Sequence, residues 1–435
     1  MYVYLPQNIF YNNRKENNVN IIFINIERGL KVDPLLKGPA LDLSGRINEL
    51  DIIRGFALLG ILVVNMPLFQ SPQLIADLYM LPQPLSATDT WIRIILDVFV
   101  ETKFFSIFSF LFGLGFFIFM ERAAEKGRNV YTLYVRRLTM LAVFGALHLL
   151  FLWYGDILLT YAFAGFLLLL FYKLKPKTLL MIITIFTVAL ILLLSANFLL
   201  SPEELQKEIQ VLQADGAGKM EEAILIYNTS SYLDWLSYRF SNEVIPLIKH
   251  LPFSMLTALY MFLLGLYVGK LNIISEFPKH KRLARNVWWI SLIISIPLSF
   301  LIVALHLDML TLRIPNSLSV QVIVTLSGLS LSIFYISTVL FLLQKEKWKK
   351  LFYPLSYLGR MALTNYIAQT VICVGIFTGF GLFGEINLAL GLIMSFIILP
   401  LQILFSYFWL KYYLYGPLEW VWRSVTYGRV QPFRR

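Results

Sequence analysis

The sequence has very little cysteine and little charge. Its one cysteine, Cys373, lies in an apolar segment, so no disulfide, zinc knuckle or haem-attachment motif can be built, and no metal site is predicted. We interpret Cys373 as a small buried hydrophobic residue. Charged residues make up 14% of the chain and hydrophobic residues 58%, against roughly 25% and 45–50% in soluble proteins. These proportions exclude an ordinary soluble protein.

The N-terminal region has no long apolar run. Residues 1–45 are polar and rich in asparagine, so we expect no cleavable signal peptide, and the first span, from Ile52, would act as an uncleaved insertion signal. We predict three parts: a polar tail over 1–45, one transmembrane helical domain over 46–428 and a basic tail over 429–435.

Apolar segments follow one another along the rest of the chain. A membrane-spanning helix needs roughly 20 apolar residues. Ten segments qualify, at about 52–69, 104–120, 134–153, 157–172, 178–199, 252–270, 287–305, 318–343, 361–383 and 388–410. The sequence therefore predicts an all-α, polytopic membrane protein with about ten transmembrane helices.

The loops between these segments alternate in charge. Lysine and arginine gather at 122–137, 173–177, 279–285 and 345–350, while the intervening loops are poor in both. Positive loops face the cytoplasm, so we expect both termini there. The net charge of +11 then reflects topology, and we expect no nucleic-acid partner.

Two segments outside the predicted spans have distinctive patterns. The acidic stretch 201–250 begins with the helix-start signals Ser201 and proline, and its later part has apolar residues at helical spacing. It either lies in the membrane interface or caps an outward-facing cavity. A partly polar helix is expected over about 87–103, with Asp97 and Glu101 on one face.

The first span carries two polar residues. Arg54 either extends to the lipid headgroups and pairs with Asp51 or binds a ligand. Asn65 lies about 16 Å further along the helix and needs hydrogen-bond partners in hydrocarbon. It is a candidate for substrate binding or for contact between helices.

The third span contains His148, and Asp156 follows the turn after it. A histidine in a membrane can act as a general base, since its ordinary pKa lies near neutrality. The alternative is a structural histidine bonded to a neighbouring helix. The hairpin geometry places Thr160 nearer than Asp156 to the depth of His148, so a direct pair of His148 with Asp156 is not favoured.

The ninth span carries Asn365 and Gln369, four residues apart and therefore on one helical face. They indicate either a polar cavity or a buried network between helices, and the sequence leaves both open.

Three motifs resemble those of the YeiB-like bacterial membrane proteins. They lie at 46–65, at 359–369 and at 416–428, so the resemblance covers about 46–428 and is strongest in the C-terminal half, about 250–428. That family in turn resembles the transmembrane acyltransferases that include the heparan glucosaminide acetyltransferases. Their Asp-x-x-Arg-Gly opening and later asparagine are similar to Asp51, Arg54, Gly55 and Asn65.

The resemblance implies a bacterial cytoplasmic-membrane enzyme that moves an acyl group from cytoplasmic acyl-CoA to an extracytoplasmic or lipid-linked acceptor. On this hypothesis His148, assigned by position, is catalytic with Asp156. The residues that would bind acyl-CoA are Arg54, Arg136, Arg137 and Arg360, and those that would bind the acceptor are Asn65, Asn365 and Gln369.

The alternative function is a transporter or export factor for a small polar or lipid-like solute. The sequence lacks the broken-helix pattern and the strongly acidic intramembrane residues that would favour it. The lipid bilayer is the expected surrounding in either case, and the oligomeric state, a homo-oligomer included, is left open.

Overall fold

The computed structural model describes residues 47–83, 85–199 and 201–435, and the predicted tail over 1–45 lies outside them. The described parts form helices, with one isolated β-bridge between Tyr413 and Arg434. The all-α prediction is confirmed.

The helices are, in chain order, α2 (Asn48–Gln70), α3 (Gln73–Leu78), α4 (Ala87–Phe99), α5 (Lys103–Glu125), α6 (Val130–Phe151), α7 (Leu158–Leu168), η3 (Leu169–Phe171), α8 (Pro176–Ser195), η4 (Ala196–Leu199), α9 (Pro202–Gly216), α10 (Lys219–Thr229), α11 (Tyr232–Arg239), η5 (Phe240–Val244), α12 (Ile245–Lys270), α13 (Phe277–His306), α14 (Asn316–Leu342), α15 (Glu346–Arg360), α16 (Ala362–Phe377), α17 (Leu388–Tyr412) and α18 (Pro417–Tyr427).

Eight helical segments of the described chain are long and apolar enough to cross a membrane, and there are nine if the bent pair α15–α16 is one span. All ten predicted segments lie on helices. The two that fall short do so for different reasons: α16 is joined to α15 at an angle of 79°, and Leu158–Phe171 is shorter than the roughly 20 residues that hydrocarbon requires. The chain is therefore a multi-pass helical membrane protein.

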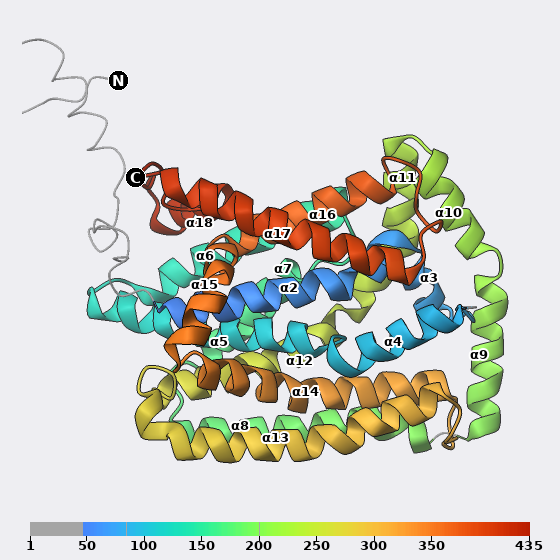
Figure 1. Cartoon of the computed structure of the whole chain (residues 1–435), viewed down its shortest axis with the longest axis horizontal. Helices are drawn as coiled ribbons and strands as arrows, with labels where there is room; N and C mark the ends of the chain where they lie inside the picture. The colour runs from blue at the N-terminus through green and yellow to red at the C-terminus, as the bar shows by residue number, and fades with distance from the viewer. Residues whose placement is uncertain (1–46, 84, 200) are drawn as a thin grey trace, which may run out of the picture.

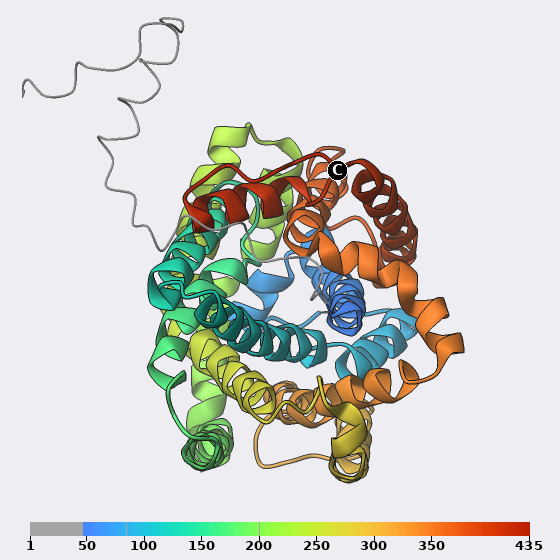
Figure 2. The same cartoon turned by 90° about the vertical axis from the view of Figure 1, so that its left-hand side faces the viewer.

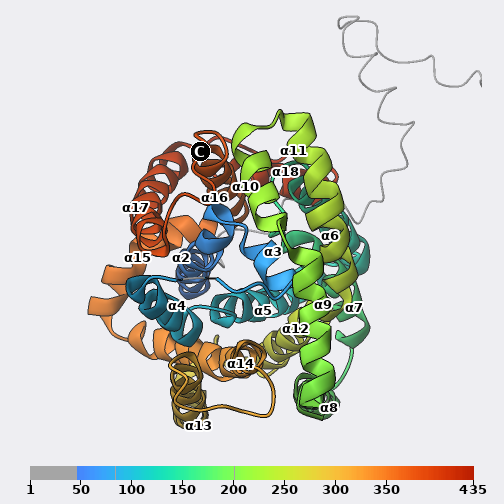
Figure 3. The same ribbon diagram turned by 90° about the vertical axis from the view of Figure 1, so that its right-hand side faces the viewer.

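Most of the long helices run along the long axis of the molecule (Figure 1). Helix α2 lies near the middle of the bundle, surrounded by the others, in the two end views (Figures 2 and 3). The most apolar part of α2 is 67% buried, whereas that of α8 is 17% buried, so α2 is the core helix and α8 is peripheral. Helix α18 and the C-terminus lie at one end, which we call the C-terminal end; α3, α9 and α10 lie at the other.

Glycine lets the core helices approach closely. A Cβ on Gly359 of α15 would lie 1.9 Å from the carbonyl oxygen of Asp51, and one on Gly55 of α2 would lie 2.0 Å from that of Leu355. Small residues at such contacts drive helix packing in lipid, where there is no hydrophobic force between helices. The contact fixes the start of α2 against the end of α15.

We expect Gly359→Ala to lower the thermal stability of the detergent-purified protein, because the new methyl group must push α2 and α15 apart. Overpacking of this kind costs about 1–3 kcal/mol. Gly375→Ala is the matched control, since a Cβ on Gly375 of α16 meets nothing within 4 Å. Equal melting temperatures for the two variants would contradict the tight contact.

The segment 201–250 begins as predicted, with the Ser201 side chain accepting a hydrogen bond from the backbone N–H of Glu204. Its later part packs on the bundle: Trp235 and Tyr238 are buried in a cluster with Ile75 and Phe383. This part of the segment therefore packs over the end of the bundle that lies opposite α18.

The helix predicted over about 87–103 is broken. Helix α4 ends at Phe99, Thr102 adopts a left-handed conformation with φ of 64°, and α5 begins at Lys103. Side chains satisfy the carbonyl groups that the break exposes: the hydroxyl of Tyr335 donates to Phe99 and the ammonium of Lys103 donates to Asp97. Such partners make a break tolerable inside a membrane, and a single sequence does not reveal them.

Candidate functional site

A cavity of about 320 Å³ lies inside the C-terminal end of the bundle. Helices α2, α5, α6, α7, α15, α16 and α18 each contribute side chains to its wall. We call it the arginine pocket, because five arginines line it: Arg54, Arg122, Arg137, Arg360 and Arg423.

Among the described residues, the lining of the arginine pocket carries more positive than negative charge. Its carboxylates within that part of the chain are Asp51 and Glu419. An oxygen of Asp51 lies 3.0 Å from a guanidinium nitrogen of Arg54, which is the predicted pairing of these two residues of α2. In this described lining the arginines outnumber the carboxylates, which suits a ligand with negative charges, because guanidinium groups match phosphate in geometry.

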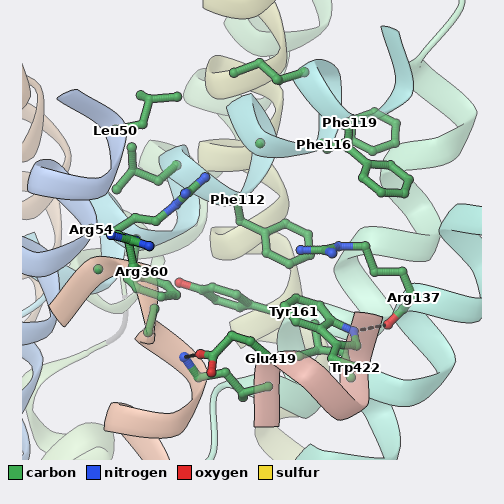
Figure 4. A pocket seen from close by; sticks show the side chains of 18 of the residues that line it. Leu50, Arg54, Phe112, Phe116, Phe119, Arg137, Tyr161, Arg360, Glu419 and Trp422 are labelled. Carbon is green, nitrogen blue, oxygen red and sulfur yellow. Dashed lines mark hydrogen bonds between the residues drawn. The ribbon is translucent and has the colours of Figure 1, made fainter. Parts of the chain in front are cut away.

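The arginines approach the cavity from different sides. Figure 4 shows Arg54 and Arg360 on one side and Arg137 on the other, with the ring of Tyr161 between them. Arg137 lies over the ring of Trp422, 3.7 Å from its centroid, and the indole N–H of Trp422 donates to the Arg137 carbonyl group at 2.8 Å. These contacts with α18 hold the guanidinium group of Arg137 over the cavity.

Glu419 of α18 caps the first turn of α16. Its carboxylate accepts hydrogen bonds from the backbone N–H groups of Leu363 and Thr364, at 2.7 and 3.0 Å, and from the Thr364 hydroxyl at 2.6 Å. Burial raises the pKa of Glu419, and these hydrogen bonds oppose the rise. The cap joins α18 to the bend between α15 and α16, where Arg360 lies.

Aromatic rings line the inner part of the cavity. The Tyr161 hydroxyl lies 2.7 Å from that of Ser109, and Phe112 stacks on Phe262 with ring centroids 4.5 Å apart. The pocket thus has a charged part and an apolar part, which suits an amphipathic ligand with a charged head.

Three buried side chains, joined by hydrogen bonds, lie beyond the inner wall of the arginine pocket. The Nδ1 atom of His148 is 2.8 Å from a carboxylate oxygen of Asp156, and its Nε2 atom is 2.9 Å from the Thr370 hydroxyl. The other oxygen of Asp156 accepts the backbone N–H of Leu159 at 2.7 Å. All three side chains are almost completely buried.

The direct pair of His148 with Asp156 is the arrangement that the hairpin geometry did not favour. Two features of the turn account for it. The backbone N–H of Trp153 donates to the His148 carbonyl group, which folds the chain back at the end of α6. Gly145 of α6 lets α7 approach closely: a Cβ added to Gly145 would lie only 2.4 Å from the backbone nitrogen of Leu159. Asp156 therefore reaches down to His148 before α7 begins.

Tyr366 separates the arginine pocket from the hydrogen-bonded side chains of Asp156, His148 and Thr370. Its side chain lines the pocket, and its ring centroid lies 5.2 Å from that of His148. The Tyr366 hydroxyl donates to the Gly155 carbonyl group at 2.8 Å and accepts the Ile157 N–H at 3.3 Å. The pocket thus ends one side chain away from His148.

The remaining predicted residues lie elsewhere. Arg136 does not line the pocket; it lies beside Gly428, whose Cβ would be 2.9 Å from its guanidinium group. Asn65 is half-buried on α2, away from the pocket lining. Asn365 and Gln369 belong to a network between helices: Asn365 donates to Ser406 at 2.9 Å and Gln369 to Gln402 at 3.0 Å. Of the two alternatives for this pair, the structure has the network.

Several residues of the site were missed from the sequence. Arg423 and Glu419 stand four apart in the C-terminal motif, and that spacing on a helix was a usable signal. Arg122 was counted only as a loop charge. Thr370 gave no signal, because a hydroxyl group in an apolar span is common and its role depends on the partner helix.

Comparison with known proteins gives relatives over nearly the full chain. A family model described as "Protein of unknown function (DUF418)" matches residues 268–429. The uncharacterized protein YxaH of Bacillus subtilis is 35% identical over 410 residues, covering 90% of this chain and 96% of that protein. The uncharacterized protein YeiB of Escherichia coli is 27% identical over 399 residues, covering 88% and 97%. No solved structure matches the chain.

Proposed function

This chain belongs to the YeiB-like (DUF418) family, and we propose that it is an acyltransferase of the bacterial cytoplasmic membrane. It would take an acyl group from cytoplasmic acyl-CoA and pass it to an extracytoplasmic or lipid-linked acceptor. The observation that supports this function best is the position of the arginine pocket, which ends one side chain away from the Asp156–His148 pair.

The parts of acyl-CoA would be bound in order along the pocket. The arginines would bind the phosphates at the C-terminal end, which the loop charges predict to be cytoplasmic. A cavity of about 320 Å³ is at the lower end of ligand-pocket sizes. It suits the pantetheine arm with a short acyl group, while the nucleotide stays at the mouth. Helical rise separates Arg137 from His148 by about 16 Å, a distance that an extended arm can reach.

The chemistry would use His148 as the base. Asp156 holds the Nδ1 side of the ring, so Nε2, which faces the Thr370 hydroxyl, is the atom that would accept a proton from a hydroxyl or amine. The deprotonated hydroxyl or amine then attacks the thioester carbon and the carbon–sulfur bond breaks. The CoA thiolate takes the proton from His148. The side-chain amide of Asn365 donates to Ser406, so we assign Asn365 no part in binding the acceptor.

We expect acetyl-CoA and CoA to raise the thermal stability of the detergent-purified protein. A ligand at 100 times its dissociation constant stabilises the native state by about 2.7 kcal/mol. The measurement is a melting curve with and without ligand, with adenosine as the control that lacks phosphates. An unchanged melting temperature at millimolar acetyl-CoA would exclude acetyl-CoA as the acyl donor.

Transport is the second candidate, and the break between α4 and α5 favours it. The ammonium group of Lys103 is completely buried there, and the Asp97 carboxylate lies 2.8 Å from a ring nitrogen of His306. Discontinuous helices and buried charges are typical of transporter binding sites. Solute uptake into proteoliposomes without release of CoA would support this function instead.

A further inference from the structure

The hydroxyl group of Thr370 is held in an unusual way. Threonine in a helix commonly donates to the carbonyl group four residues earlier. In this chain Thr184, Thr187, Thr325, Thr338 and Thr426 all do so. Among the described residues, the Thr370 hydroxyl has one hydrogen-bond partner, which is Nε2 of His148 on a different helix. Its side chain is therefore committed to the histidine and not to its own helix.

The direction of that hydrogen bond follows from Asp156. Its two oxygens face the His148 Nδ1 atom, at 2.8 Å, and the Leu159 N–H, at 2.7 Å, so each oxygen lies beside a nitrogen that can donate to it. A carboxylate only accepts hydrogen bonds, so we assign Nδ1 as the donor to Asp156 and Nε2 as the acceptor. The hydroxyl of Thr370 consequently donates to Nε2. This is the order of orienting acid, base and nucleophile in enzymes that form acyl intermediates.

We propose that Thr370 is the nucleophile that carries the acyl group between donor and acceptor, an inference that rests on the proposed acyltransferase function. His148 would take the hydroxyl proton while the Thr370 oxygen attacks the thioester carbon. The carbon–sulfur bond breaks, the CoA thiolate takes the proton from His148, and an ester forms on Thr370. An acceptor hydroxyl or amine then attacks the ester, gives its proton to His148 and leaves Thr370 with its hydroxyl restored.

The position of Thr370 along the membrane supports a covalent intermediate. Helix α16 runs from the Glu419 cap at the C-terminal end to Phe377, near the opposite end. Thr370 lies at its middle, about 12 Å from its first residue by helical rise. His148 is 1% exposed, and Tyr366 lies between it and the pocket, so donor and acceptor have little room to meet there together. Transfer in two steps lets CoA leave before the acceptor arrives.

Tyr366 has a consequent part in the first step. It stands one helical turn before Thr370 on α16, on the side of the pocket. The thioester reaches Thr370 only when the Tyr366 side chain turns aside and gives up its hydrogen bonds with Gly155 and Ile157. Tyr366 is thus a positioning residue that opens the inner wall of the pocket.

The test is to trap the ester. The purified full chain is incubated with radiolabelled acetyl-CoA without acceptor, quenched in acid, and the labelled peptide is identified by mass spectrometry. We expect label on Thr370 in the native protein and in Thr370→Ser, and none in Thr370→Val, whose side chain has the same shape. Cys373 lies one turn further on and is the only thiol of the chain. Cys373→Ala should therefore keep the label.

The outcomes separate this inference from the proposed function. Acetyl transfer to membrane acceptors with no ester, or with full activity in Thr370→Val, overturns the nucleophile and leaves the acyltransferase in place. Label on His148 or Cys373 also overturns it. Absence of both acetyl-CoA stabilisation and transfer in the native protein removes the proposed function, and Thr370 with it. A melting temperature for Thr370→Val close to that of the native protein shows that the loss is chemical.

Discussion

Replacing His148 with glutamine should reduce acyl transfer by about 10²–10⁴-fold, the usual contribution of a general base. In this structure the ring makes two hydrogen bonds, to Asp156 and to Thr370, and no other base touches the Thr370 hydroxyl among the described residues. Glutamine can keep a hydrogen bond to one of these partners but cannot take up a proton. The rate is measured as acetyl-CoA-dependent release of CoA in membrane vesicles that contain the overproduced protein and their own lipids.

The binding of acetyl-CoA provides the control for this loss. His148 does not line the arginine pocket, so His148→Gln should keep the stabilisation by acetyl-CoA that the native protein has. Asp156→Asn should also be slow, since the amide no longer fixes the proton on Nδ1. An unchanged rate of CoA release in His148→Gln would remove this residue from the mechanism and return it to a structural role.

The sequence was sufficient for the helices because the bilayer imposes simple requirements. Apolar length alone placed all ten predicted segments on helices. The break before Lys103 was not predicted, because it depends on partners from distant parts of the chain. On α14, the Tyr335 hydroxyl donates to the Phe99 carbonyl group, and the Val324 carbonyl group accepts a hydrogen bond from the Thr102 hydroxyl. No local pattern in 87–103 contains that information.

The site was predicted less completely than the fold, for a geometric reason. Loop charges named a basic region but not which arginine faces inward, since neighbouring residues on a helix point about 100° apart. Arg137 therefore lines the pocket while Arg136 does not. The pairing of His148 with Asp156 depended on the close approach at Gly145, and Thr370 became visible only when α16 was placed beside α6.

The different positions of Arg136 and Arg137 predict a large difference in acetyl-CoA binding between variants of these two residues. Arg137→Gln should bind acetyl-CoA about 10–100-fold more weakly, because a hydrogen bond to a charged group contributes about 1.5–3 kcal/mol. Arg136→Gln should bind it as the native protein does. Both changes remove one positive charge from the same turn of α6, so a general effect of charge on the membrane surface or on folding would affect them equally. Only a ligand inside the pocket distinguishes them.

The thermal shift makes the comparison quantitative. At acetyl-CoA 100 times the native dissociation constant, the native protein and Arg136→Gln should gain about 2.7 kcal/mol. A hundredfold weaker Arg137→Gln should gain about 0.4 kcal/mol under the same conditions. Arg137 also contacts Trp422, so each variant is compared with its own ligand-free melting curve. Equal shifts in the two variants would place the phosphates outside the arginine pocket, and the donor site would then have to be sought at another surface of the bundle.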